Sequence, residues 1–419
     1  MKLRISGLLA IATFVLLGSA QSLAQNAYIT DGSNSVSVID TATNTVIATI
    51  PVGSVGGEPF GVAVSPNGGK AYLTNTGSAT VSVIDTEKNA VSTTITVGHD
   101  PFGVAVSPDG SRVYVASEQS DTVSVIDTAT NTVSAMIPVG VGASPFGVAV
   151  SPDGSKVYVA NAASTVSVIA TATNTVSATI PVGFSPFGVA VTPDGSKVYV
   201  TNESSTNHTV SVIDTATDAV VATIPVGFFP FGVAVTPDSG KVYVANAQSN
   251  TVSVIATATD AVIATIGVGA SPSGVAVSPN GGKVYVANQS SNNVSVIDTA
   301  TNTVTATIPV GNDPIAFGVF IQPTPKFAGT PGKANCYTAK VSRRSSGSIT
   351  GSMPLPQRWG SPASRRCKML SWRFAGDEQF GAGFNIRVPD VSLPLARSEN
   401  GCRSVCQQGA HGPDRASSG

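Results

Sequence analysis

Two histidines and six acidic residues are the side chains of this sequence best suited to catalysis or ligand binding. They lie in the variable loops of an internal repeat and remain once the residues used in every repeat are set aside: Glu58, His99, Asp100, Glu118, Asp121, Glu203, His208 and Asp313. Carboxylate and imidazole groups bind divalent cations, and imidazole also serves as a general base. We therefore expect these eight residues to mark a ligand-binding face. A divalent cation at that face stays an alternative, and no other cofactor is predicted.

Catalysis at this face would depend on a histidine, because the other common signatures are missing. Residues 183–187 have the sequence GFSPF, which lacks the closing glycine of a nucleophile elbow. Residues 140–145, GVGASP, do not match a dinucleotide-binding loop. These loops also contain no Lys or Arg to hold a phosphorylated substrate. The enzymatic alternative is therefore a metal-assisted hydrolase or lyase for a small lactone or ester, with His99 or His208 as the base.

The loops are positioned by a repeat whose anchor is usually Pro-Phe-Gly. The anchor recurs from Pro59 to Pro314 at intervals of 41 to 44 residues. Each unit contains four short runs rich in Val, Ile, Thr and Tyr, separated by Ser-Pro-Asp-Gly, a variable loop, a Thr-Ala-Thr-Asn-like turn and Pro-Val-Gly. Four strands in about 40 to 45 residues are typical of a propeller blade. No run in the repeats has the helical period of about 3.6 residues.

The ends of the repeat region indicate how many blades there are. Six complete units span residues 59–311 and are flanked by two complementary fragments. Residues 27–53 contain the second to fourth strands of a unit, and residues 314–323 contain a first strand. Their pairing would close a ring and remove two open sheet edges. The sequence therefore predicts an all-β fold, a seven-bladed β-propeller of four-stranded antiparallel blades over residues 25–325, and we expect it to be monomeric.

The second strand of each unit has a characteristic sequence. It is KVYVAN at residues 156–161, KAYLTN at residues 70–75 and KVYVTN at residues 197–202, and TVSVIDTATNTV-like segments follow. This repeat resembles that of the YVTN family of β-propeller repeat proteins, found on microbial surfaces and among secreted proteins. The resemblance covers about 301 of the 419 residues and implies the propeller fold. It does not define a function, because such propellers include scaffolds, binding modules and some enzymes.

One repeat position contains six basic residues, each at the start of a second strand: Lys70, Arg112, Lys156, Lys197, Lys241 and Lys283. The third strand ends at the same end of the blade, in five units with an aspartate: Asp40, Asp85, Asp127, Asp214 and Asp298. We expect ion pairs between these neighbouring strands, together with Asx turns at the aspartates. A ring of cations that binds anions is the alternative.

Both ends of the chain differ from the repeats. Lys2 and Arg4 precede an apolar run at residues 7–18, and Ser22 and Ala24 frame a cleavage site, so residues 1–24 are predicted to be a signal peptide. No apolar run reaches the roughly 20 residues of a membrane span. Residues 326–419 contain all four Cys and 14 of the 23 Lys and Arg, without regular strand spacing. We expect this tail to be irregular or disordered.

The sequence favours binding over catalysis. We expect an exported protein, periplasmic, secreted or on the cell surface, that acts as a non-enzymatic scaffold or binding module. Its loop-bearing face would recognise a protein, a glycan or another cell-envelope ligand, because loops on a rigid scaffold usually provide binding. Nucleic acid is not expected as a partner, since the formal net charge is −1. Catalysis would require several of the histidines and carboxylates to lie close to one point near the axis.

Overall fold

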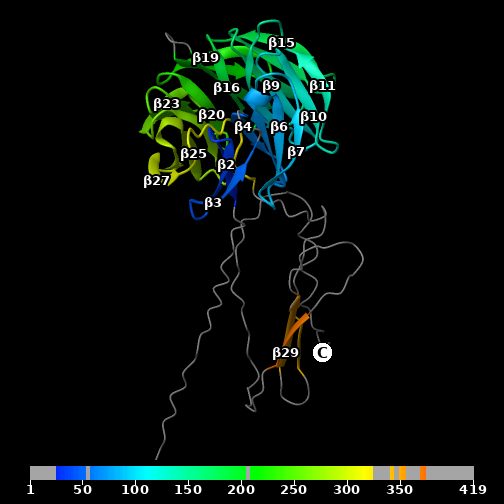
Figure 1. Ribbon diagram of the computed structural model, residues 1–419. Coiled ribbons are helices and arrows are strands. Elements are labelled where there is room, and N and C mark those ends of the chain that lie inside the picture. The colour runs from blue at the N-terminus through cyan, green and yellow to red at the C-terminus, as the bar shows by residue number, and fades with distance from the viewer. Residues whose placement is uncertain are drawn as a thin grey trace, which may run out of the picture. The chain divides into compact units, whose positions relative to one another are not determined.

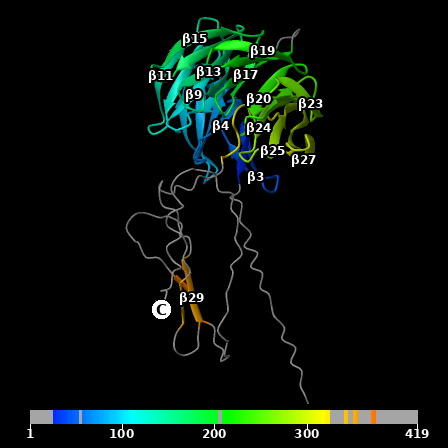
Figure 2. The same cartoon turned by 180° about the vertical axis from the view of Figure 1, so that it is seen from behind.

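Seven antiparallel sheets stand around a common axis (Figure 1 and Figure 2). The computed structural model describes residues 25–52, 57–203 and 208–323, and the backbone of three short strands between residues 340 and 373. Each complete blade contains four strands in chain order, with the anchor proline opening the innermost strand. The fold is therefore the all-β seven-bladed propeller that the repeat predicts. The predicted signal peptide, residues 1–24, lies outside the described residues.

The strands follow the repeat position by position. The innermost strands are β4 (Pro59–Val64), β8 (Pro101–Val106), β12 (Pro145–Val150), β16 (Pro186–Val191), β20 (Pro230–Val235) and β24 (Pro272–Val277). The second strands are β5 (Lys70–Asn75), β9 (Arg112–Ser117), β13 (Lys156–Asn161), β17 (Lys197–Asn202), β21 (Lys241–Asn246) and β25 (Lys283–Asn288). The third strands are β6 (Thr80–Asp85), β10 (Thr122–Asp127), β14 (Thr165–Ala170), β18 (Thr209–Asp214), β22 (Thr251–Ala256) and β26 (Asn293–Asp298).

The outer strands complete the blades at the circumference of the ring. They are β7 (Ala90–Thr96), β11 (Thr132–Pro138), β15 (Thr175–Pro181), β19 (Ala219–Pro225), β23 (Ala261–Gly267) and β27 (Thr303–Pro309). The first sheet has only β1 (Asn26–Asp31), β2 (Ser35–Asp40) and β3 (Thr45–Pro51). We number the blades 1 to 7, from β1–β3 to β24–β27. The loop-bearing face is the end where second strands lead into third strands and where one blade leads into the next.

Residues 314–322 close the ring beside β1, as the sequence predicts, although they do not form a regular strand. The amide of Tyr28 donates to the carbonyl oxygen of Phe320 at 2.9 Å, and the amide of Ile315 donates to that of Thr30 at 3.0 Å. Compared with the other anchors, this segment has two extra residues, Ile315 and Ala316, before its phenylalanine. The surplus length interrupts the regular register: Ala316 has a φ of 47°, and the segment pairs with its neighbours through isolated bridges instead of a continuous strand ladder.

The anchor glycine allows neighbouring innermost strands to approach closely. A Cβ atom added to Gly147 of blade 4 would lie 2.3 Å from the carbonyl oxygen of Phe187 in blade 5. The glycines of the other five complete anchors meet a backbone carbonyl of the next innermost segment in the same way: Gly61, Gly103, Gly188, Gly232 and Gly274. Only glycine lacks the atom that would keep the strands apart.

A buried polar residue ends the second strand and explains the glycine of Pro-Val-Gly. Asn202 is fully buried, and its Nδ2 donates to the hydroxyls of Thr209 and Ser211 at 3.1 and 3.0 Å. A Cβ atom added to Gly183 would lie 2.5 Å from the side-chain carbon of Asn202. Five blades have asparagine at this position, whereas blade 1 has Asp31 and blade 3 has Ser117. The asparagine joins the second and third strands where the loops begin.

Replacing Ser117 by asparagine is expected to stabilise the protein by about 1 kcal/mol. In blade 3 the hydroxyls of Ser117 and Thr122 are buried without a hydrogen-bond partner among the described residues. An asparagine would donate two hydrogen bonds, to Thr122 and Ser124, against one amide oxygen left without a partner, as in the five native asparagines, and Gly98 leaves the space that its equivalents leave elsewhere. Chemical denaturation measures the change in unfolding free energy. The reverse substitution in blade 4, Asn161→Ser, is the control and should destabilise, whereas a less stable Ser117→Asn protein would contradict this account.

The basic side chains at the start of the second strands reach the next blade, so the ion pairs expected within a blade are wrong. Lys197 lies opposite Asp214 in the strand register, but its Nζ contacts the carbonyl oxygen of Thr257 at 2.8 Å and the carboxylate of Asp260 at 2.7 Å. The equivalent Lys156 contacts Asp218 at 2.9 Å. The side chain is long enough to cross the interface, where the turn between third and fourth strands supplies an outward-pointing carbonyl. These cations therefore hold neighbouring blades together.

The aspartates at the ends of the third strands form the expected Asx turns. The amide and the hydroxyl of Thr217 donate to Oδ1 of Asp214 at 2.9 and 2.8 Å. Both hydrogen bonds lower the pKa of Asp214, and the bond from the Thr217 hydroxyl has the larger effect. The Ser-Pro-Asp-Gly turns are similar, since the hydroxyl of Ser107 and the groups of Ser111 lower the pKa of Asp109 to about 2. The carboxylates at the end of the blades opposite the loop-bearing face thus stabilise turns.

The tail contains a sheet that sequence analysis did not anticipate. β28 (Lys340–Arg343), β29 (Ile349–Pro354) and β30 (Met369–Arg373) pair antiparallel in that order. This sheet belongs to a second unit, Ala328–Gly419. The expectation of an irregular tail otherwise lies outside the described residues. No helix in the described part of the chain has the length and apolarity to cross a membrane.

Candidate functional site

Phenylalanine side chains fill the axis of the ring at its loop-bearing end. They come from the second position of the innermost strands and from the closing segment: Phe60, Phe102, Phe146, Phe187, Phe231 and Phe317. The ring of Phe187 lies 3.9 Å from that of Phe231, 4.6 Å from that of Phe146 and 5.3 Å from that of Phe317, measured between centroids. We call these six side chains the phenylalanine plug, which was not among the features predicted from the sequence. The signal was the phenylalanine that follows five of the seven anchor prolines.

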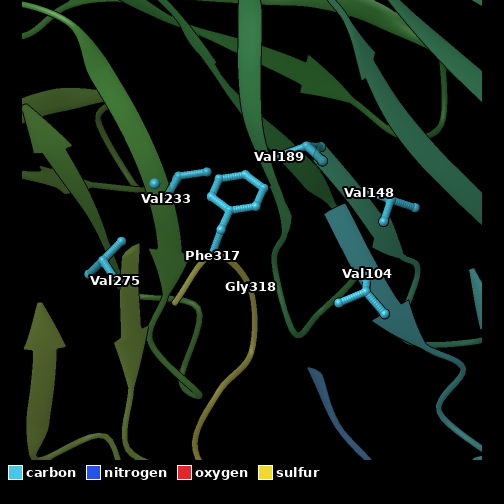
Figure 3. Close-up of a pocket in the computed structure, with 8 residues that line it drawn as sticks. Val104, Val148, Val189, Val233, Val275, Phe317 and Gly318 are labelled. Carbon is cyan, nitrogen blue, oxygen red and sulfur yellow. The ribbon is translucent and has the colours of Figure 1, made fainter. Parts of the chain in front are cut away.

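Deeper along the axis the channel is apolar and narrow. Figure 3 shows Phe317 surrounded by valines from the innermost strands, which line a cavity of about 20 Å³: Val104, Val148, Val189, Val233 and Val275. That volume is close to the space that one water molecule needs. No titratable side chain lines the cavity. This cavity therefore has room for about one water molecule and an apolar lining.

Three of the eight predicted site residues share one repeat position, the residue before the anchor proline. Glu58, Asp100 and Asp313 have φ angles of 43°, 50° and 50°. The other blades have Ser144, Ser185, Phe229 and Ser271 at this position, all with positive φ. The loop thus requires a left-handed backbone at this position, and serine adopts it in three other blades without a carboxylate. These carboxylates are exposed or half-buried at separate blade junctions.

Two further candidates are acceptors for the loop backbone. Oδ1 of Asp121 accepts from the amide of Ser144 at 2.8 Å, and Nδ1 of His208 accepts from the amide of Phe229 at 3.2 Å. The Ser144 and Gly142 amides lower the pKa of Asp121. Asparagines do the same work in three other blades: Asn34, Asn250 and Asn292. Asp121 and His208 are therefore substitutions at a structural position, which a position-by-position alignment of the repeats would have revealed.

The three remaining candidates lie in loops of different blades. Glu118 and Glu203 open the second-to-third-strand loops of blades 3 and 5, and their amides donate to the carbonyl oxygens of Asp100 and Ser185, each at 2.9 Å. The side chain of His99 is exposed, and its amide donates to the hydroxyl of Ser120 at 2.8 Å. Across the described residues, no group of three or more His, Cys, Asp or Glu side chains is arranged to hold a metal ion. The eight residues are thus distributed around the face.

The loops of blade 5 bring candidate residues and aromatic rings together. The ring of Phe228 packs edge-on against His208, with 4.7 Å between centroids. Phe184 and Phe228 are 65% and 59% exposed. Glu203 follows the second strand of the same blade and is half-buried. His208 packs against the rings of both Phe228 and Phe229.

Comparisons with known proteins agree with the fold. The chain is a seven-bladed β-propeller protein, and residues 161–315 match the model of the choice-of-anchor I domain. Among solved structures, it is similar to a functionally unknown protein from Desulfotomaculum acetoxidans DSM 771, with 16% identity and a TM-score of 0.60, covering 70% of this chain and 100% of that chain. It is also similar to Kuenenia stuttgartiensis hydrazine synthase, with 23% identity and a TM-score of 0.46, covering 59% and 97%. A search of curated proteins finds no match.

Proposed function

We propose that this protein is an exported, non-enzymatic β-propeller of the YVTN repeat type that binds a protein, glycan or other cell-envelope ligand through its loop-bearing face. The phenylalanine plug is the main support for this proposal. It closes the axis beneath the loops, where Phe187 and Phe317 are each only 6% exposed, and leaves binding to the loops. Residues 1–24 and the match to the choice-of-anchor I domain support export and a location at the cell surface.

The charge of the loop-bearing face argues against nucleic acid as the partner. The described loops of this face contain acidic residues and histidines but no Lys or Arg. Binding to a phosphate backbone depends on such cations. The six basic residues that begin the second strands lie at the opposite end of the blades. Their side chains donate hydrogen bonds to carbonyl oxygens of the next blade.

The full chain is expected to cosediment with isolated envelopes of the cells that produce it, and a loop-face variant is expected to bind about tenfold more weakly. That variant has five substitutions by serine, at Glu58, His99, Phe184, Phe228 and Asp313. Glu58 and Asp313 stand at the repeat position that has serine in three other blades, so these two substitutions should keep the conformation of their loops. The matched control has serine on the opposite face, at Glu87, Lys88, Ala129, Ala216 and Ala258.

Two results would overturn the proposal. One is equal binding by the loop-face variant and the control. The other is hydrolysis or elimination of small lactones or esters that stops when a chelator is added and returns with a divalent cation, which would favour the metal-assisted enzyme with His99 or His208 as base. Because no described cluster could hold a metal, we expect no chelator-sensitive turnover.

A further inference from the structure

A cavity of about 440 Å³ lies between blades 2 and 3, at the end of the blades opposite the loop-bearing face. Ligand pockets of proteins typically have volumes of about 300 to 1,000 Å³. The cavity is bounded by the turn between the first two strands of each blade and by the second strand of blade 2. Its lining combines charged, polar and apolar groups, among them Pro66, Asn67, Lys70, Tyr72, Pro108 and Asp109.

Lys70 brings to this cavity a positive charge that no described carboxylate neutralises. Its Nζ donates to the carbonyl oxygen of Thr128 at 3.1 Å and to Oδ1 of Asn131 at 3.3 Å, both of which are neutral acceptors. At two other junctions an aspartate replaces the asparagine and pairs with the lysine, as Asp260 does with Lys197 at 2.7 Å. An ammonium group has three N–H donors, so Lys70 keeps one for a ligand.

Two neutral donors beside Lys70 are also free. Tyr72 is 1% exposed, and its hydroxyl has no hydrogen-bond partner among the described residues, whereas the equivalent Tyr199 donates to Asp260 at 2.7 Å. Burial raises the pKa of Tyr72 to about 12, so the hydroxyl keeps its proton at neutral pH. Asn67 uses its Oδ1 to accept from the amide of Gly69 at 3.0 Å, which leaves its amide N–H groups for a ligand.

A carboxylate lines the same cavity from blade 3. Asp109 accepts from the hydroxyl of Ser107 and from the hydroxyl and amide of Ser111. These bonds, of which the one from Ser107 has the largest effect, lower its pKa to about 2, so it is charged at neutral pH. No ion pair joins it to Lys70 within 4 Å in the described part of the chain. A cation and an anion thus line one cavity without neutralising each other.

We infer that the cavity between blades 2 and 3 binds a free α-amino acid, with its carboxylate on Lys70 and Tyr72 and its ammonium group on Asp109. A zwitterion matches both charges of the cavity, whereas a simple carboxylate or amine would leave one of them without a partner. Asn67 supplies a further donor for the carboxylate. The two prolines of the lining favour an apolar side chain. The site is separate from the loop-bearing face and does not depend on the proposed function.

Titration calorimetry of the full chain with leucine and with phenylalanine tests the inference. At least one of them is expected to bind. Analogues without the ammonium group (isocaproate, hydrocinnamate) or without the carboxylate (isoamylamine, phenethylamine) are expected to bind about tenfold more weakly or less. Tyr72→Phe removes a hydroxyl that has no described partner and should weaken amino-acid binding about fivefold without changing stability.

Asp109→Asn separates a ligand contact from a structural role. Blades 2 and 7 have asparagine at this turn position, Asn67 and Asn280, so the turn should keep its conformation. The variant is expected to bind the amino acid about tenfold more weakly but the analogue without an ammonium group at least as well as the wild type does. Tyr114→Phe and Asp153→Asn make the same changes at the next junction and should leave binding unchanged.

The outcomes are distinct from those that test the proposed function. If neither amino acid binds, or if Tyr72→Phe and Asp109→Asn both bind like the wild type, the site is wrong. Equal affinity for the amino acid and for its analogue without an ammonium group would show a carboxylate site and overturn the zwitterion assignment. The five-substitution loop-face variant should bind the amino acid like the wild type, because its changes lie at the other end of the blades.

Discussion

Replacing Gly147 by alanine is expected to lower the free energy of unfolding by about 3 kcal/mol or more, or to prevent folding. The added Cβ would lie 2.3 Å from the carbonyl oxygen of Phe187 and 3.2 Å from the amide nitrogen of Val189, both in blade 5. Both groups are main-chain atoms of hydrogen-bonded strands, so no side-chain rotation relieves the clash. Denaturant unfolding monitored by circular dichroism measures the loss.

Gly267→Ala is the matched control for this experiment. Gly267 ends the outer strand β23, and a Cβ atom there would have no heavy atom within 4 Å. Its substitution should change the unfolding free energy by less than about 1 kcal/mol, in the stabilising direction if at all. Equal stability of the Gly147→Ala and Gly267→Ala proteins would show that the innermost strands can separate, and that the anchor glycine has another role.

Replacing Phe187 by alanine is expected to cost about 3 to 5 kcal/mol of stability. Phe187 is 6% exposed, and its ring contacts those of four other blades or segments: Phe60, Phe146, Phe231 and Phe317. The truncation would remove the centre of the phenylalanine plug and leave a cavity that the rigid ring of blades cannot collapse to fill. Thermal and chemical unfolding of the purified full chain measure the effect.

Phe184→Ala provides the comparison, because it removes the same side chain from a position that is 65% exposed. Its effect on stability should stay within about 0.5 kcal/mol. If the two alanine variants unfold alike, the plug does not stabilise the ring.

Contacts within one repeat were predictable from the sequence, and contacts between repeats were not. Strand positions and the blade count follow from the alternation of apolar residues and the turn residues of each unit. Lys197 illustrates the limit: its register partner is Asp214, but its ammonium group reaches Asp260 of the next blade. A repeat pattern shows which residues recur, whereas the geometry between blades decides where a long side chain goes.

The eight candidate residues lie in the loops where the sequence places them, and several of them occupy structural positions of the repeat. Setting aside recurring residues isolates His208 and Asp121, although both stand where other blades have asparagine acceptors. Loops have to be compared position by position and by backbone conformation to separate structural residues from ligand-binding ones. The left-handed φ of Glu58 or Phe229 cannot be read from the composition of a loop.

The seam where the ring closes has a mechanical consequence. Residues 314–322 hold blade 1 through a few backbone hydrogen bonds, such as Tyr28 to Phe320 and Gln322 to Asn26 at 2.9 Å each, rather than through a full strand ladder. Residue 323 follows this segment directly, so a load applied to the chain beyond it reaches these few bonds before the four-stranded ladder of any complete blade. If the tail anchors the protein, the closing segment is its point of mechanical yield, and the six complete blades are shielded until it gives way.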